Sequence, residues 1–168
     1  GTQRWRELAF LHWEVDADAL RQQIPAGLTL DTFEGRAFVG VVPFAMEGVR
    51  PRWSPISFDF LETNVRTYVH KDGRDPAVFF FSLDAASWLA VQAARVGWGL
   101  PYHHATMSLT RTDQRVAYET VRRAGDAALR VTWEIGRSLG PSAPGTLEHF
   151  LMERYLLFSS KGGDLLVG

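Results

Sequence analysis

The chain has 168 residues, of which 46% are hydrophobic and 22% are charged, so we expect one domain over residues 1–168 with a self-sufficient core. The formal net charge is −1, which argues against a nucleic-acid or anionic-membrane partner. The lack of cysteine excludes disulfides, thiolate catalysis and cysteine-based zinc sites. No run approaches the ~18 apolar residues of a membrane span, and no signal-like segment follows Gly1. A cytoplasmic location is the default expectation and is not deduced from these observations.

Lysine is rare in this chain. Only two of the 18 basic residues are lysines, Lys71 and Lys161. Both are surrounded by glycine and aspartate residues typical of turns, where an ammonium group is solvated. A Schiff base requires an amine that is neutral near pH 7, so imine catalysis by either lysine is not expected.

The hydrophobic pattern predicts mostly strands with a few short helices. Strands are expected over residues 6–15, 29–33, 36–46, 58–70, 77–83, 102–112, 115–123, 128–135, 154–160 and 164–167. Helices are expected up to residue 24 after an Asp16 cap, over 85–97 after an Asp84 cap, and up to residue 153 after a Thr146 cap. Glu34-Gly35 predicts a hairpin turn. The order predicts a β-dominated fold, either α+β or a small barrel, with an antiparallel meander over residues 102–135.

The predicted strand over 58–70 carries the most informative polar pattern. Because alternate residues of a strand share a face, Glu62, Asn64, Arg66 and Tyr68 point to one side, about 6.6 Å apart from one to the next. Inside a barrel, Arg66 would bind a carboxylate or enolate and Glu62 would move a proton. The alternative is a solvated outer face with cross-strand ion pairs.

The strand over 102–112 places neighbouring polar side chains on opposite faces. Tyr102 and His104 share one face, on which they are either an acid/base pair or part of a wet strand surface. His103 lies on the apolar side, which is typical of a hydrogen-bonded core histidine. The five histidines lack metal-ligand spacing, so no metal is expected, although a metal site formed by His104 and Glu62 stays open as an alternative. No cofactor is expected either, since Gly97-x-Gly99 lacks the third glycine of a dinucleotide-binding loop.

Several short sequence motifs together resemble those of the YqjF-like family of uncharacterised bacterial proteins, over nearly the whole chain and in the same order. They are His12-Trp13, Leu30-Asp31-Thr32-Phe33-Glu34-Gly35, Val42-Pro43-Phe44, Glu62-Thr63-Asn64-Val65-Arg66-Thr67-Tyr68-Val69, Phe81-Ser82-Leu83-Asp84-Ala85, Ala94-Arg95, Gly99-Leu100-Pro101-Tyr102, Gly145-Thr146-Leu147 and Glu153-Arg154-Tyr155. The resemblance implies the fold of acetoacetate decarboxylase, a cone-shaped antiparallel β-barrel with two or three flanking helices and an internal cavity. Members of the family usually continue beyond the position of Gly168, so a C-terminal segment of the barrel wall is expected to be missing.

The resemblance also implies a change in chemistry. Acetoacetate decarboxylase carries Gly-Phe-Pro-Lys-Lys, in which the first lysine forms the Schiff base and the second lowers its pKa. The matching stretch is Gly99-Leu100-Pro101-Tyr102-His103, so Tyr102 stands at the reactive position and His103 beside it. Glu62 and Arg66 are the expected counterparts of the carboxylate and arginine in the pocket of that enzyme.

These observations predict a barrel that binds a small acid or carbonyl compound in an internal cavity without Schiff-base chemistry. Tyr102 and Glu62 are the candidate catalytic residues, and Arg66, Asn64, Tyr102, His103 and His104 are the candidate ligand-binding residues. One alternative is a lyase, enolisation or hydration enzyme that uses Tyr102 and Glu62 as acid and base. Another is a structural or oligomerising module with a closed cavity, and a homo-oligomer is compatible with each reading.

Overall fold

A computed structural model describes residues 2–50, 57–88, 91, 100–161 and 164–167. Most of these residues lie in strands. The elements are β1 (Thr2–Arg6), β2 (Leu11–Val15), α1 (Ala17–Arg21), β3 (Thr29–Leu30), β4 (Ala37–Arg50), β5 (Phe58–Lys71), β6 (Arg74–Ala85), β7 (Tyr102–Arg111), β8 (Arg115–Arg122), β9 (Ala128–Glu134), α3 (Leu147–Met152), β10 (Leu156–Lys161) and β11 (Asp164–Val167).

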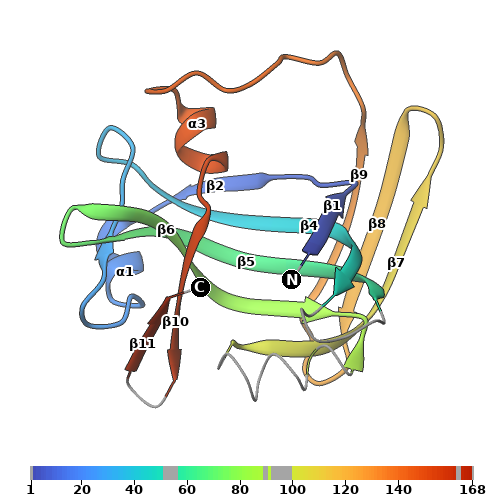
Figure 1. The fold of residues 1–168 in the computed structure, drawn as a ribbon, viewed down its shortest axis with the longest axis horizontal. Coiled ribbons are helices and arrows are strands. Elements are labelled where there is room, and N and C mark those ends of the chain that lie inside the picture. Colours follow the sequence, from blue (N-terminus) through green and yellow to red (C-terminus); the bar gives the residue numbers. More distant parts are fainter. Residues whose placement is uncertain (1, 51–56, 89–90, 92–99, 162–163, 168) are drawn as a thin grey trace.

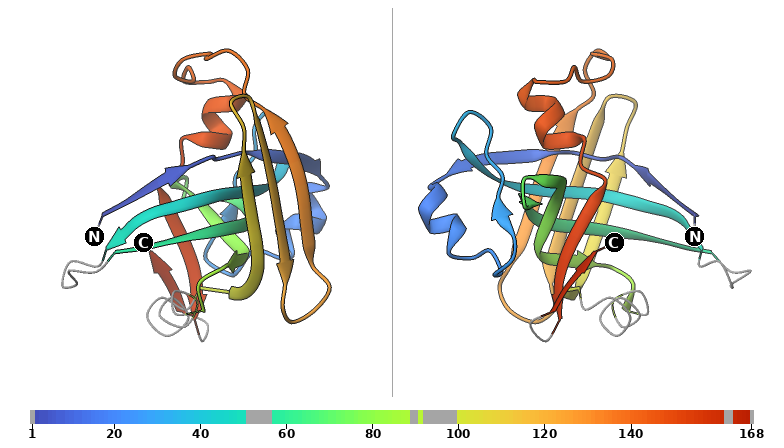
Figure 2. Two further views of the ribbon diagram at one scale, coloured as in Figure 1. Left: turned by 90° about the vertical axis from the view of Figure 1, so that its right-hand side faces the viewer. Right: turned by 60° about the vertical axis from the view of Figure 1, so that its left-hand side comes forward.

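Three long antiparallel strands, β4, β5 and β6, form the centre of the sheet (Figure 1). A two-residue turn at Asp72 and Gly73 joins β5 to β6. Both residues have positive φ, which gives the turn a twist that matches the right-handed twist of the two strands. The strand order is β1-β4-β5-β6-β7-β8-β9, and Figure 2 shows the meander β7–β9 curling across the end of the central strands. This curled, half-barrel sheet confirms the predicted β-dominated α+β fold.

Two strand pairs are parallel, which the sequence did not predict. β6 pairs with β7 through Leu83–Ala85 and with β10 through Ala77–Phe79, both in parallel register. A parallel pair needs a long crossover. The segment 86–101 supplies it between β6 and β7, and the whole meander with α3 supplies it between β6 and β10.

Three predicted elements differ from the structure. The strand expected over 6–15 is two strands, β1 and β2, because Glu7 has a φ of 49° and breaks the extended chain. The segment expected as a strand over 29–33 pairs with β5 at Thr29–Leu30, so the Glu34-Gly35 turn closes only an isolated bridge. Asp84 lies in β6, where its carboxylate accepts a hydrogen bond from Arg122 at 2.9 Å rather than serving as a helix cap.

Two helix caps follow the prediction. The Asp16 carboxylate accepts from the backbone of Ala19 at 2.7 Å and caps α1, and Thr146 accepts from the backbone of His149 and caps α3. The helix expected over 85–97 falls largely outside the described residues, although Trp88 is helical. Within the described part of the chain, no helix has the length and apolar character needed to cross a bilayer.

Both faces of β5 are covered. On one face, α3 packs through Leu147, Phe150 and Leu151 onto a cluster that contains Tyr68. Figure 1 shows this helix standing over the end of the sheet near β2. On the other face, Thr63 donates to the hydroxyl of Tyr118 from β8 at 3.2 Å. The polar residues in the middle of β5, from Glu62 to Tyr68, are therefore inside the molecule.

Candidate functional site

The polar face of β5 is buried. Glu62 is 3% exposed, Asn64 4%, Arg66 4% and Tyr68 0%. The solvated outer face that the sequence left open is therefore wrong for this strand. Placing a carboxyl, an amide and a guanidinium in one buried row costs desolvation energy, so the partner of each group needs to be identified.

The first cluster on this face joins Glu62 to Tyr102. The Tyr102 hydroxyl donates to Glu62 Oε2 at 2.7 Å. The two residues can meet because β6 pairs with β5 on one side and with the first residues of β7 on the other. Burial raises the pKa of Glu62 from its usual 4.5 to about 7, and hydrogen bonds from Tyr102 and Asn64 oppose this rise. Burial and the nearby Glu62 raise the pKa of Tyr102, so its phenol stays protonated. The result is a buried acid that titrates near neutral pH beside a fixed hydroxyl donor.

The second cluster surrounds Arg66. Its Nη2 donates to the carbonyl of Leu151 in α3 at 3.2 Å, and its guanidinium carbon lies 5.0 Å from the ring centroid of Phe10 and 5.8 Å from that of Tyr68. Among the described residues, no carboxylate forms an ion pair with Arg66. Arg66 is thus a buried cation whose hydrogen-bond partners in the described structure are neutral.

The sequence analysis missed His12 as part of this cluster. His12 Nε2 lies 2.6 Å from the Tyr68 hydroxyl, which donates its single proton to the Leu151 carbonyl at 2.9 Å, so His12 is the donor to Tyr68. Burial and the positive Arg66 lower the pKa of His12 to about 4, which keeps the imidazole neutral. The β2–β4 register sets His12 opposite Gly40, where a Cβ would lie 3.1 Å from the imidazole. The sequence alone does not predict how β2 pairs with β4, so it could not show that His12 lies beside Tyr68.

A third ionic group holds α3 against the sheet. Arg154 donates to Asp31 at 2.7 Å and to the carbonyl of Phe150 at 2.9 Å, and its guanidinium lies 4.3 Å from the Phe150 ring centroid. The Arg154 side chain is 6% exposed. This pair anchors the C-terminal end of α3 beside Tyr68.

The structure brings together some of the predicted site residues. Tyr102, Glu62 and Asn64 form one cluster, while Arg66 lies farther along the same strand face. Phe80 packs against the hydrophobic clusters at both ends of this face. The convergence of Glu62, Arg66 and Tyr102 on one cavity stays a prediction.

The two histidines after Tyr102 are half-buried in β7. His103 lies opposite Asp84 and His104 opposite Ala85 in the parallel register with β6. Their roles as ligand-binding residues also stay predictions. Within the described ranges, no three metal-ligating side chains group together.

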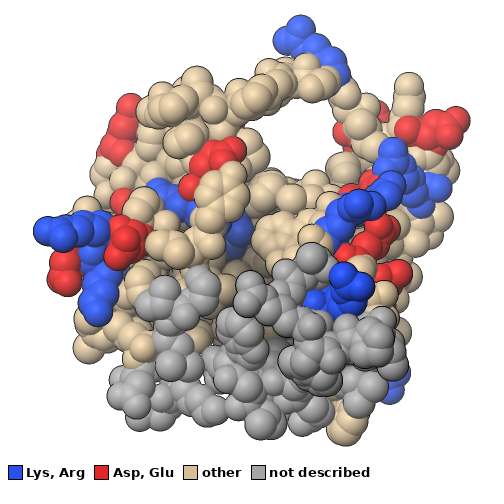
Figure 3. Space-filling view, in the orientation of Figure 1, with Lys and Arg blue, Asp and Glu red and all other residues tan. Residues whose placement is uncertain are grey.

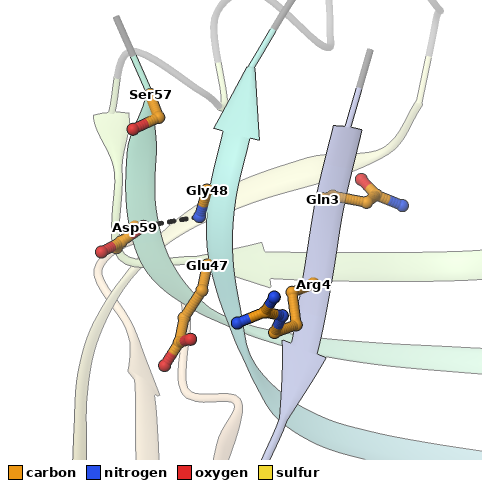
Figure 4. A pocket seen from close by; sticks show the side chains of 6 residues that line it. All are labelled: Gln3, Arg4, Glu47, Gly48, Ser57 and Asp59. Carbon is orange, nitrogen blue, oxygen red and sulfur yellow. Dashed lines mark hydrogen bonds between the residues drawn. The ribbon is translucent and has the colours of Figure 1, made fainter.

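Described residues form two surface pockets, one away from these clusters and one beside the Arg154–Asp31 pair. One, of about 440 Å³, is lined by Gln3, Arg4, Glu47, Gly48, Ser57 and Asp59, and Figure 4 shows Asp59 accepting from the Gly48 amide at 2.7 Å. The other, of about 320 Å³, lies beside α3 and includes Asp31, His149 and Arg154. Figure 3 also shows an opening beneath the 136–145 connection, and both charge signs scattered over this side of the molecule.

The family model of DUF2071, described as an uncharacterised conserved protein, matches residues 2–168. The chain belongs to this family. It is 35% identical over 162 residues to the uncharacterised protein YqjF of Bacillus subtilis, covering 94% of this chain and 66% of YqjF. The chain therefore spans slightly less than two thirds of that relative.

Solved structures share the fold. Acetoacetate decarboxylase from Legionella pneumophila is 19% identical, with a TM-score of 0.64 over 94% of this chain and 58% of that enzyme. The enduracididine biosynthesis enzyme MppR complexed with pyruvate is 14% identical, with a TM-score of 0.64 over 95% of this chain and 65% of that chain. An acetoacetate decarboxylase-like enzyme from Sphingomonas wittichii is 15% identical, with a TM-score of 0.63 over 93% of this chain and 62% of that chain. The predicted family and fold are confirmed.

Proposed function

We propose that this chain binds a small carboxylic acid or carbonyl compound over the buried face of β5. Arg66 holds the carboxylate, and Tyr102 with Glu62 contacts the polar end of the ligand. A single observation supports the proposal most strongly. On one buried face of β5, Glu62 accepts a hydrogen bond from Tyr102, and Arg66 is a cation with no acidic partner in the described structure.

The environment of Arg66 favours an anionic ligand. A buried guanidinium that lacks a negative partner pays a desolvation cost of several kcal/mol, which neutral acceptors offset only in part. A carboxylate provides charge-assisted hydrogen bonds about twice as strong as those to the Leu151 carbonyl. The aromatic rings of Phe10 and Tyr68 hold the guanidinium in place for that contact.

The Glu62–Tyr102 pair suits a carbonyl or hydroxyl oxygen. Near pH 7 Glu62 exchanges between its acid and its carboxylate form, so it can donate to or accept from a ligand. The Tyr102 phenol stays protonated and can donate to a carbonyl or enolate oxygen. A phenol forms no imine, and Lys71 is exposed at the end of β5. The proposal therefore involves no covalent intermediate.

The test is ligand titration by NMR chemical-shift perturbation with pyruvate, acetoacetate and propionate. Arg66→Gln is expected to weaken binding of each acid at least tenfold, because the charge-assisted contact is lost. Arg66→Lys retains the charge and is expected to keep part of the affinity. Arg130→Gln, at a side chain that is 80% exposed, is the matched control. Equal affinity in wild type and a folded Arg66→Gln, or no binding of any acid, refutes the proposal and favours a structural module.

A second candidate function is proton transfer next to a carbonyl group. It is favoured by the pKa of about 7 at Glu62, since a general base works best near the operating pH. The test is deuterium exchange into the methyl groups of pyruvate and acetoacetate. Catalysed exchange that Glu62→Gln abolishes and Tyr102→Phe slows would establish an enzyme. Exchange at the uncatalysed rate would rule out this second candidate and leave ligand binding as the proposed function. Borohydride trapping with acetoacetate is expected to yield no adduct at Lys71 or Lys161.

A further inference from the structure

Two neighbouring polar atoms on the buried face of β5 have no hydrogen-bond partner in the part of the chain that the structure describes. Asn64 Oδ1 and Arg66 Nε are both fully buried and have no hydrogen bond among the described residues. Both side chains are 4% exposed and point to the same face, about 6.6 Å apart along the strand. A buried polar atom without a partner costs about 1–3 kcal/mol, so this juxtaposition of one acceptor and one donor calls for an occupant.

The orientation of each group defines what it requires. The Asn64 side chain donates a hydrogen bond to the Glu62 carboxyl through its amide nitrogen, and its Oδ1 has no donor among the described residues. Arg66 uses Nη2 for the Leu151 carbonyl, while its Nε has no acceptor among the described residues. The occupant must therefore donate to Asn64 and accept from Arg66 at the same time.

We propose that the ligand of this site is a short hydroxy acid, whose carboxylate accepts from Arg66 Nε and whose neighbouring hydroxyl donates to Asn64 Oδ1. This inference rests on the proposed function and specifies its ligand class. A keto acid presents only acceptors at both positions and leaves Asn64 Oδ1 unsatisfied. An amino acid would bring a second positive charge next to the buried Arg66.

The discriminating experiment compares three-carbon acids of nearly equal size. The dissociation constants of D-lactate, L-lactate, pyruvate, propionate and L-alanine are measured by NMR titration at one pH. One lactate enantiomer is expected to bind at least about tenfold more tightly than pyruvate and propionate, because a site that hydrogen-bonds a ligand hydroxyl rejects analogues that lack it. L-Alanine is expected to bind no more tightly than propionate.

Asn64→Leu provides the second arm, since it removes the acceptor at similar volume. The preference for lactate over pyruvate is expected to fall to about onefold, while the affinity for propionate is retained. Gln23→Leu, which removes an exposed amide in the turn after α1, is the control and keeps the preference. The wild-type series tests the inference even if Asn64→Leu does not fold.

The outcomes separate this inference from the proposed function. Equal affinity for lactate, pyruvate and propionate overturns the hydroxy-acid assignment and leaves acid binding intact. Failure of every acid to bind overturns both. A crystal structure with lactate that instead shows a water bridging Asn64 Oδ1 and Arg66 Nε overturns the hydroxy-acid assignment alone.

Discussion

Glu62 makes the stability of this protein depend on pH in a calculable way. Its pKa is about 7 in the folded chain against a usual 4.5, chiefly because of burial. Between these values the unfolded chain has already lost the proton that the folded chain still holds. The unfolded state binds fewer protons there, so the free energy of unfolding falls as the pH rises from 4.5 to 7. With ~1.4 kcal/mol per pKa unit, the loss contributed by Glu62 is about 3 kcal/mol.

Glu62→Gln isolates this contribution, because glutamine is a neutral side chain of the same shape. Urea unfolding of wild type and variant is measured at intervals from pH 4.5 to 8. The wild-type free energy of unfolding minus that of Glu62→Gln is expected to decline by about 3 kcal/mol up to pH 7 and then to level off. The difference for Glu14→Gln, at a side chain that is 57% exposed, serves as the control.

Two results would refute this reasoning. A Glu62→Gln difference that stays constant within about 1 kcal/mol over the window means that Glu62 is already ionised in the folded chain. A difference that rises with pH means that the hydrogen bonds from Tyr102 and Asn64 outweigh burial.

Three further predictions concern the cluster around α3 and β2. Gly40→Ala places a methyl group 3.1 Å from the His12 ring and is expected to cost about 1–3 kcal/mol in urea unfolding, whereas Gly136→Ala, where no atom lies within 4 Å, is expected to be nearly neutral. The pKa of His12 is about 4, so its ring ¹⁵N chemical shifts are expected to stay constant from pH 5.5 to 8. The stability that the neutral imidazole contributes is expected to be lost as the pH falls from 6.5 to 4. A ring titration near pH 6.5 would contradict the burial of His12. Asp31→Asn leaves the buried Arg154 without its counter-ion and is expected to lower the free energy of unfolding by about 3 kcal/mol and to speed hydrogen exchange in α3; unchanged exchange would show that the pair does not hold the helix.

Local sequence determined much of the secondary structure. The turn at Asp72-Gly73 and the caps Asp16 and Thr146 act on their nearest neighbours in the chain, so their chemistry can be predicted from a few residues. The alternation of residues 62–68 also predicted which side chains share a face, because side chains on a strand alternate with a period of two. The Gly-Leu-Pro-Tyr stretch and its neighbours indicated the family that the comparisons confirm.

Only the tertiary structure decided what covers those faces. Alternation says that Glu62 and Arg66 lie on one side of β5, but burial comes from α3 and β7, whose positions depend on long-range pairing. The parallel register of β6 with β7 brings Tyr102 to Glu62, and the register of β2 with β4 brings His12 to Tyr68. These contacts join residues 40 and 56 positions apart, and a pKa near 7 for Glu62 arises only once they exclude water.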